Sequence, residues 1–101
     1  MPKYDGVIEA VHYTPDGQVA WVRAYERRGP AFSDRVLIDR ASLVEKLEQG
    51  KRFMLGRRIE SMAGSFDVSV PVRLVRQKDG VLLASDHLQH THDSIEGVPV
   101  I

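Results

Sequence analysis

The chain has 101 residues, of which 43% are hydrophobic, and equal numbers of basic and acidic side chains, 14 of each. A chain of this length is expected to form one domain with a modest core that is stable without disulfides or bound metals. The absence of cysteine excludes disulfides, thiolate zinc sites, iron–sulfur clusters and cysteine nucleophiles, and fits a reducing compartment. No apolar run approaches the roughly 18 residues that span a bilayer, and the start of the chain has no apolar signal region. We therefore expect a cytoplasmic protein with no membrane contact.

Charge is distributed unevenly along the chain. All 14 Lys and Arg residues lie between Lys3 and Lys78, a stretch that holds ten Asp and Glu residues and so carries a net charge of +4. Residues 79–101 hold the other four acidic residues and carry a charge of −4. A balance this weak argues against a strong nonspecific polyanion binder, although it leaves room for a local basic patch.

Two strands joined by a tight turn are expected at the start of the chain. The sequence Thr14-Pro15-Asp16-Gly17 combines a proline, which presets φ, with a glycine, which permits positive φ. Residues 6–13 before this turn and residues 18–28 after it are rich in valine and aromatic side chains, as strands are. We therefore predict a β-hairpin, followed by a third strand at residues 32–39.

A short helix is expected next. Ser42 followed by Glu45 matches the capping box, in which a serine begins a helix and a glutamate three residues later bonds back to it. Gly50 is then expected to end the helix at the C′ position. A helix of about two turns depends on packing for its stability. Its apolar stripe is Leu43, Val44 and Leu47.

Three more strands are expected in the second half of the chain. They are residues 51–60, 66–76 and 81–84, with a loop at residues 61–65 between the first two. The turn Lys78-Asp79-Gly80 joins the last two strands and predicts a second hairpin.

The strand at residues 66–76 has the cleanest alternation of hydrophobic and polar side chains. Pro71 cannot donate a backbone hydrogen bond, so this strand is expected at a sheet edge or at a bend. The alternation predicts which side chains face the core. Together with those of the third strand and the helix, they are Val36, Ile38, Leu47, Phe66, Val68, Val70, Val72 and Leu74.

The order of these elements is three strands, a helix and three strands. About six short strands with one short α-helix between the third and fourth indicate a mainly β protein that forms a single small β-barrel. The place of the helix is similar to that in OB-folds over roughly residues 6–77, and an SH3-like barrel is the main alternative. We predict a barrel domain at residues 1–86 and a C-terminal tail at residues 87–101.

The stretch DHLQHTH, residues 86–92, holds three of the four histidines. A histidine metal site needs two or three imidazoles around one ion. In a helix His87 and His90 would be neighbours and His92 would point elsewhere, whereas in a strand His90 and His92 would share a face without His87. We therefore predict a solvated polar exit from the last strand and no metal site. The other candidate ligands are His12, Asp86 and Asp93.

Catalytic motifs are absent from the sequence. There is no glycine-rich phosphate loop and no GxSxG nucleophile elbow. The serines have no spacing that indicates a nucleophile. We therefore expect a binding module that is not an enzyme and carries no cofactor.

The second strand contains the strongest candidate for a binding surface. Ala20, Val22 and Ala24 lie on one side of it, and aromatic residues alternate with arginines on the other. If the small residues face the interior, the aromatic rings are exposed beside guanidinium groups. This arrangement suits single-stranded nucleic acid, because bases stack on the rings while arginine contacts phosphate. With arginines from the fourth strand, the candidate ligand-binding residues are Trp21, Arg23, Tyr25, Arg27, Arg52 and Arg58.

The same residues also fit a protein interface, where Trp, Tyr and Arg are enriched. They also fit an ordinary structural role, in which Trp21 and Tyr25 lie in the core. The apolar end of the chain, residues 97–101, can pack on its own barrel or along the sheet edge of a partner, including a second copy of the chain. Our first prediction is weak single-stranded nucleic-acid binding, and the alternative is a protein-interaction or homo-oligomerisation domain.

Overall fold

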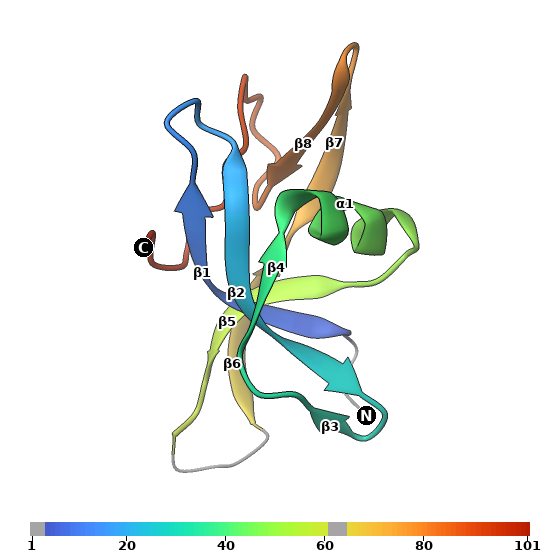
Figure 1. Cartoon of the computed structure of the whole chain (residues 1–101), viewed down its shortest axis with the longest axis vertical. Helices are drawn as coiled ribbons and strands as arrows, with labels where there is room; N and C mark the ends of the chain where they lie inside the picture. The colour runs from blue at the N-terminus through green and yellow to red at the C-terminus, as the bar shows by residue number, and fades with distance from the viewer. Residues whose placement is uncertain (1–3, 61–64) are drawn as a thin grey trace.

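The computed structural model describes residues 4–60 and 65–101. Within these residues the protein is mainly β, with eight strands in two sheets and one short helix (Figure 1). Most of the loop predicted at residues 61–65 lies outside the described residues. In chain order the elements are β1 (Gly6–Tyr13), β2 (Val19–Arg28), β3 (Ala31–Phe32), β4 (Val36–Asp39), α1 (Arg40–Glu48), β5 (Phe53–Arg58), β6 (Phe66–Pro71), β7 (Arg73–Gln77) and β8 (Gly80–Ala84).

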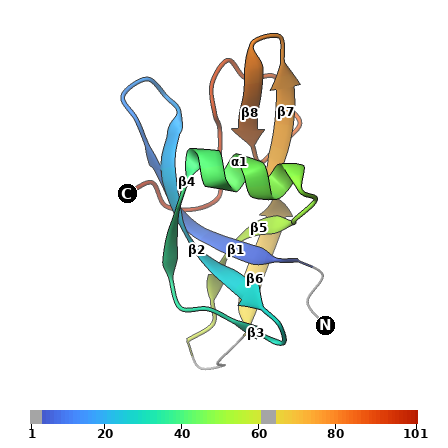
Figure 2. The same ribbon diagram turned by 45° about the vertical axis from the view of Figure 1, so that its right-hand side comes forward.

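The larger sheet has the strand order β3-β2-β1-β5-β6, and β4 also pairs with β2. β1 is antiparallel to β2 and parallel to β5. β7 and β8 form a separate hairpin, which stands at one end of the molecule beside α1 (Figure 2). The described strands do not form a closed barrel, so the OB-like or SH3-like barrel stays a prediction. None of the described residues belongs to a helix that is long and apolar enough to cross a membrane.

Both predicted hairpins are confirmed. The first turn places Gly17 at φ +86°, and its N–H donates to the carbonyl of Thr14 at 3.0 Å. The second turn joins β7 to β8 through Gly80, which also has positive φ. The predicted third strand is interrupted, because Ser33 turns back to β2 and hydrogen-bonds Glu26 through both its backbone N–H and its hydroxyl. That strand is therefore divided into β3 and β4.

The helix α1 begins one turn earlier than predicted. Its N-cap is Asp39, whose carboxylate accepts a hydrogen bond from the Ser42 N–H at 2.8 Å. That hydrogen bond lowers the pKa of Asp39. The prediction that Ser42 caps the helix is wrong, because the aspartate at the end of β4 already satisfies the amide that defines the cap. The predicted end is confirmed, with Gly50 at φ +88° in the C′ position.

The predicted strand at residues 66–76 is two strands in different sheets. β6 pairs with β5 at the edge of the larger sheet, as Pro71 indicated, and the chain then leaves that sheet at Val72. The prediction that every alternate side chain faces the core is wrong for Val70, which is 40% exposed, and Phe66 and Val68 are half-buried and lie outside the core cluster. A change of sheet breaks the alternation, so Val72 is buried and Leu74 packs against the core from β7.

The core lies between β1, β2 and β5 of the larger sheet, the helix α1, and β8 with the segment that follows it. Ile38 is buried as predicted, and Val36 and Leu47 pack partly buried against the core. Ile95, which falls in the predicted tail, is buried in the same cluster. The buried cluster is Ile8, Val11, Val19, Val22, Ala24, Ile38, Leu43, Phe53, Leu55, Val72, Leu83 and Ile95.

Candidate functional site

Two of the predicted binding residues lie on the outer side of the larger sheet. Trp21 is paired with His12 on β1 and with Asp39 on β4. The His12 and Trp21 rings stack with their centroids 4.9 Å apart, and Trp21 is half-buried, so part of its ring stays accessible. Arg23 follows on the same side and is paired with Leu37, which is 64% exposed.

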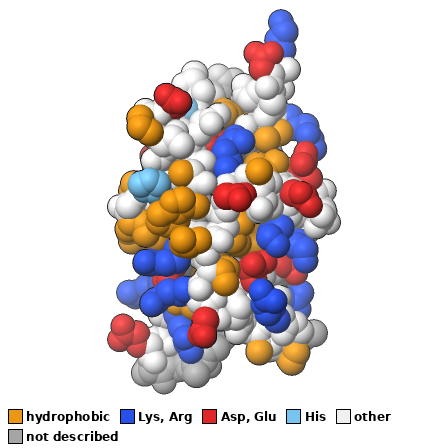
Figure 3. Space-filling view, in the orientation of Figure 1, with side chains coloured by type: hydrophobic (Ala, Val, Ile, Leu, Met, Phe, Trp, Pro, Cys, Tyr) orange, Lys and Arg blue, Asp and Glu red, His pale blue; other side chains and the backbone are white. Residues whose placement is uncertain are grey.

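The end of the chain borders this surface. The Ile101 N–H donates to the carbonyl of Val11 at 2.9 Å, and His12 Nδ1 hydrogen-bonds the Ile101 oxygen. The apolar end therefore packs along its own β1. Figure 3 shows hydrophobic side chains gathered beside a histidine and next to a group of Lys and Arg side chains on one face of the molecule. We call the surface formed by His12, Trp21, Arg23, Leu37 and Ile101 the outer face.

Tyr25 does not present its ring to solvent, and the prediction that it does is wrong. It is only 2% exposed, and its ring centroid lies 5.0 Å from that of Phe66 on β6. The Arg35 guanidinium lies 6.0 Å from the centroid of the same ring. β1 and β5 separate β2 from β6 in the strand order, so the sheet must curl to bring these rings together. Tyr25 is therefore unavailable for stacking on a base.

Carboxylates hold most of the arginines near the outer face. Glu9 Oε1 accepts from Arg23 Nε at 3.1 Å and from Arg35 Nε at 2.6 Å. Arg27 is paired with Asp5 at 2.9 Å. The pKa of this aspartate is lowered by a hydrogen bond from the backbone N–H of Arg52 and by the Arg27 side chain. These guanidinium groups are therefore less available to a phosphate than the sequence predicted.

Arg52 and Arg58, the other two predicted residues, have exposed side chains and make no ion pair within the described residues. Arg58 lines a hollow of about 1170 Å³ between β1, β5 and β6, together with Arg35 and Arg57. Three carboxylates and an aromatic ring line it as well, so its charges are balanced. Arg52 does not line this hollow, because it precedes β5, whereas Arg58 is the last residue of β5. The other lining residues are Glu9, Ile59, Glu60, Phe66 and Asp67.

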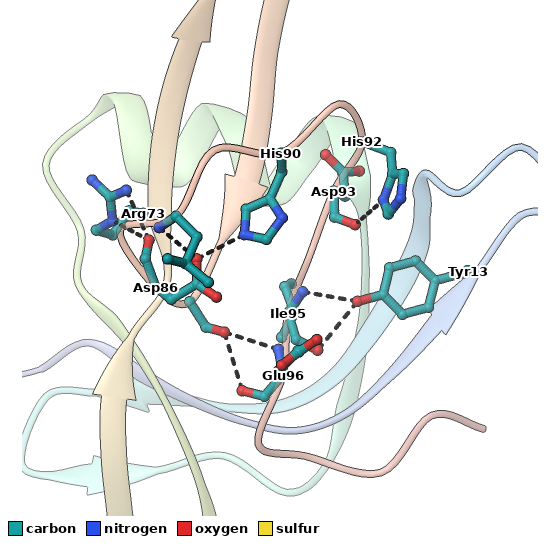
Figure 4. A network of polar contacts seen from close by, with 10 residues as sticks. Tyr13, Arg73, Asp86, His90, His92, Asp93, Ile95 and Glu96 are labelled. Atoms are coloured by element: carbon teal, nitrogen blue, oxygen red, sulfur yellow. Dashed lines mark hydrogen bonds and ion pairs between the residues drawn. The ribbon is translucent and has the colours of Figure 1, made fainter.

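The histidines of residues 86–92 do not converge. His90 Nε2 lies 2.7 Å from Asp86 Oδ1, and His92 Nδ1 lies 2.9 Å from the Asp93 carbonyl oxygen (Figure 4). His87 is exposed. In residues 4–60 and 65–101, no three His, Cys, Asp or Glu side chains are arranged to hold a metal ion. The absence of a metal site in this segment therefore stays a prediction.

Asp93 has a structural position that sequence reasoning missed. Its carboxylate is buried and accepts from Arg40 Nε at 2.8 Å, from the Val19 N–H at 2.7 Å and from the Leu83 N–H at 2.9 Å. Burial by itself raises the pKa of Asp93, but the hydrogen bonds from Arg40 and the two backbone amides outweigh it and leave the pKa lowered. These partners lie 53, 74 and 10 residues away in the sequence, so no local pattern could have identified them.

Tyr13 and Ser85 fix the segment after Asp93. The Tyr13 hydroxyl accepts from the Ile95 N–H at 2.8 Å and lies 3.2 Å from the carbonyl oxygen of the same residue (Figure 4). Ser85 makes the equivalent pair of bonds to the backbone of Glu96. Burial raises the pKa of Tyr13. Residues 93–96 are therefore held to the body of the protein by backbone-directed hydrogen bonds.

Comparisons with protein-family models, with curated proteins and with solved structures find no match to this chain. The function of the chain is therefore inferred from its own exposed side chains. Two surfaces near β2 offer exposed apolar, aromatic and basic side chains to a partner. They are the outer face and the arginine-lined hollow.

Proposed function

We propose that this domain is a non-enzymatic interaction module that associates with a second copy of itself through the outer face. The observation that carries the proposal is the exposed Leu37 beside the half-buried Trp21 on an edge of the larger sheet. A tryptophan, an arginine and exposed aliphatic side chains are the composition of interface centres. Ile101, 46% exposed, extends the apolar part of this surface.

The edge position of β4 favours a second copy as the occupant. β4 pairs with β2 on one side only, and no described strand covers its other side. Antiparallel addition of a second β4 about a two-fold axis would continue the sheet and satisfy the open backbone groups. Leu37 lies near the middle of Val36–Asp39, so such pairing would bring the two Leu37 side chains together. A formal net charge of zero adds little electrostatic repulsion between copies.

Leu37→Lys is expected to weaken self-association by about 30-fold or more, since a central interface residue contributes about 2 kcal/mol or more and 1.4 kcal/mol is tenfold. Light scattering or sedimentation equilibrium across a range of protein concentrations measures the effect. Leu88→Lys is the matched control, because Leu88 is 69% exposed and lies on a different segment. This variant should associate as the wild type does. A wild-type mass of one chain at every concentration would contradict the proposal, and so would equal association of the Leu37→Lys variant.

Single-stranded nucleic-acid binding is the second candidate, and the exposed arginines of the hollow favour it. The Arg57 side chain is 81% exposed, and its only ion pair in the described chain is with Asp67 at the long distance of 3.8 Å. Arg58 and the Phe66 ring lie in the same hollow. The curl of the sheet that brings Phe66 against Tyr25 supports barrel-like closure of the OB or SH3 type, and OB-folds commonly bind oligonucleotides.

A labelled oligothymidine is expected to bind at low salt, and Arg57→Gln with Arg58→Gln should weaken that binding. Each lost phosphate contact should reduce the log–log salt slope by about 0.7, because fewer counterions are released. Fluorescence anisotropy measures both quantities, and Lys78→Gln, at an exposed position in the turn between β7 and β8, is the control. An absence of binding at low salt rejects this candidate and leaves the self-association proposal standing.

A further inference from the structure

A cleft of about 640 Å³ lies between β7 and residues 86–91, and we call it the histidine cleft. Its charged and titratable lining consists of Arg73 and Arg76 from β7 and His87 and His90 from the segment. Two glutamines and a threonine also line it, and every one of these seven side chains can donate a hydrogen bond. No Asp or Glu of the described chain lines the cleft, whereas three line the arginine hollow. A surface that is rich in donors and has no carboxylate in its lining is complementary to an anion.

Asp86 does not line the cleft, but it orients two of these donors, Arg73 and His90. Its backbone oxygen accepts from Arg73 Nε at 3.0 Å and from Arg73 Nη2 at 2.8 Å. Its carboxylate contacts His90 Nε2 at 2.7 Å and accepts from the Leu88 N–H at 3.1 Å (Figure 4). Arg73 has five N–H groups, so three remain for a ligand. The site therefore has donors that are held in place before any ligand arrives, which reduces the entropic cost of binding.

The lining of the cleft carries the permanent positive charges of Arg73 and Arg76. Two carboxylates contact this lining without being part of it: Asp86 bonds His90, and Glu48 of α1 lies 3.8 Å from Arg76 Nη1. The hydrogen bond with His90 lowers the pKa of Asp86. The Arg76 side chain is 73% exposed, so its guanidinium group remains accessible to a ligand.

We propose that the histidine cleft binds a phosphate-type oxyanion through the guanidinium groups of Arg73 and Arg76 and the neighbouring donors of residues 87–91. Planar guanidinium groups match the oxygens of phosphate. The exposed Leu88 and the half-buried Val75 line the same cleft and offer apolar contact to the organic part of a phosphate monoester. The site is separate from the outer face and does not depend on self-association.

Sulfate is the best first probe, because its charge does not change near neutral pH while that of phosphate does. Titration of the ¹⁵N-labelled protein with sulfate at pH 6 should shift amide signals of β7 and residues 86–91. Amide shifts elsewhere only, or no shifts at any sulfate concentration, would overturn the proposal.

Three variants test which residues form the site. Arg76→Gln, at an exposed position that should not affect folding, should weaken sulfate binding by about tenfold, because a charged hydrogen-bond donor is lost. His87→Ala together with His90→Ala should also weaken binding, because two donors of the lining are lost. His92→Ala is the matched control, since His92 is exposed in the same stretch but does not line the cleft. Unchanged binding in Arg76→Gln and in the double variant, or loss of binding in His92→Ala, contradicts the assignment.

The source of the oxyanion is then tested at pH 6 with inorganic phosphate, phosphoserine and serine. Tighter binding of phosphoserine than of phosphate assigns the cleft to a phosphate monoester, because only the ester can contact Leu88 and Val75. Equal binding of the two assigns it to the free anion. Binding of serine as tight as that of phosphoserine would overturn the proposal, since the phosphate would then contribute nothing.

Discussion

Asp93→Ala is expected to lower the free energy of unfolding by about 3–5 kcal/mol, the usual effect of removing one partner of a buried ion pair. The variant leaves the Arg40 guanidinium without its carboxylate in a site where that side chain is only 23% exposed. It also leaves the backbone amides of Val19 and Leu83 without an acceptor. Urea denaturation at pH 7 measures the loss. A loss below about 1 kcal/mol would show that the network contributes little.

Two further variants identify the source of this effect. Asp67→Asn removes a carboxylate of 64% exposure from a 3.8 Å ion pair, and it should change stability by less than about 1 kcal/mol. Arg40→Ala combined with Asp93→Ala should cost less than the sum of the single changes, because no unpaired cation remains. Strict additivity would mean that the two side chains stabilise the fold independently.

The effect of Asp93 should also depend on pH. Its pKa is lower in the folded protein than the ordinary value of about 3.9 for aspartate. A lowered folded pKa means that the carboxylate contributes its full stability above about pH 4 and loses it as the pH falls through the folded value. The difference in unfolding free energy between the wild type and Asp93→Ala should therefore be constant from pH 7 to about 5 and shrink below pH 4. A difference that grows on acidification would contradict the lowered pKa.

Phe53→Ala is expected to cost about 3–5 kcal/mol, because it removes a ring that is 1% exposed at the centre of the core. Phe53 begins β5, where the parallel register places it opposite Gly6 of β1. The ring fills the space where a Gly6 side chain would lie, since a Cβ there would overlap Phe53 Cε2 and approach Cδ2 to 2.6 Å. A loss of this size is a large part of the stability of a small domain.

The same contact predicts strong coupling between the two positions. Gly6→Ala should destabilise the wild type by about 1–3 kcal/mol through overpacking, and by clearly less in the Phe53→Ala background, where the ring is absent. Leu43→Ala is the control background, because Leu43 is also fully buried but is not among the atoms nearest to Gly6. Equal costs of Gly6→Ala in all three backgrounds would disprove the coupling.

Local signals in the sequence predicted the elements well where a single residue controls the backbone. Gly17, Gly50 and Gly80 all have positive φ, and each ends or turns an element at the predicted place. The same kind of reasoning failed where two local signals competed. Asp39 and Ser42 are both good caps, and the aspartate prevails because β4 ends there and brings it to the first turn of α1.

The candidate sites were predictable only in part. Alternation along β2 placed Trp21 and Arg23 on the outer side of the sheet, where they lie. It also placed Tyr25 there, but the curl of the sheet covers that ring with Phe66. The histidine cleft could not be predicted, because it needs Arg73 and Arg76 of β7 beside residues 86–91.

Turn residues and the period of side chains act within a few neighbouring residues, so the sequence predicts a mainly β domain with two hairpins and a short helix. Which polar groups are buried together, and which surfaces remain open, depends on how distant segments pack against one another. Asp93 illustrates this difference, since it looks like any polar residue in a histidine-rich stretch and yet joins β2, β8 and α1. The physical reason is that burial of a charge is stable only when distant segments supply its hydrogen-bond partners, and no local pattern records where those segments meet.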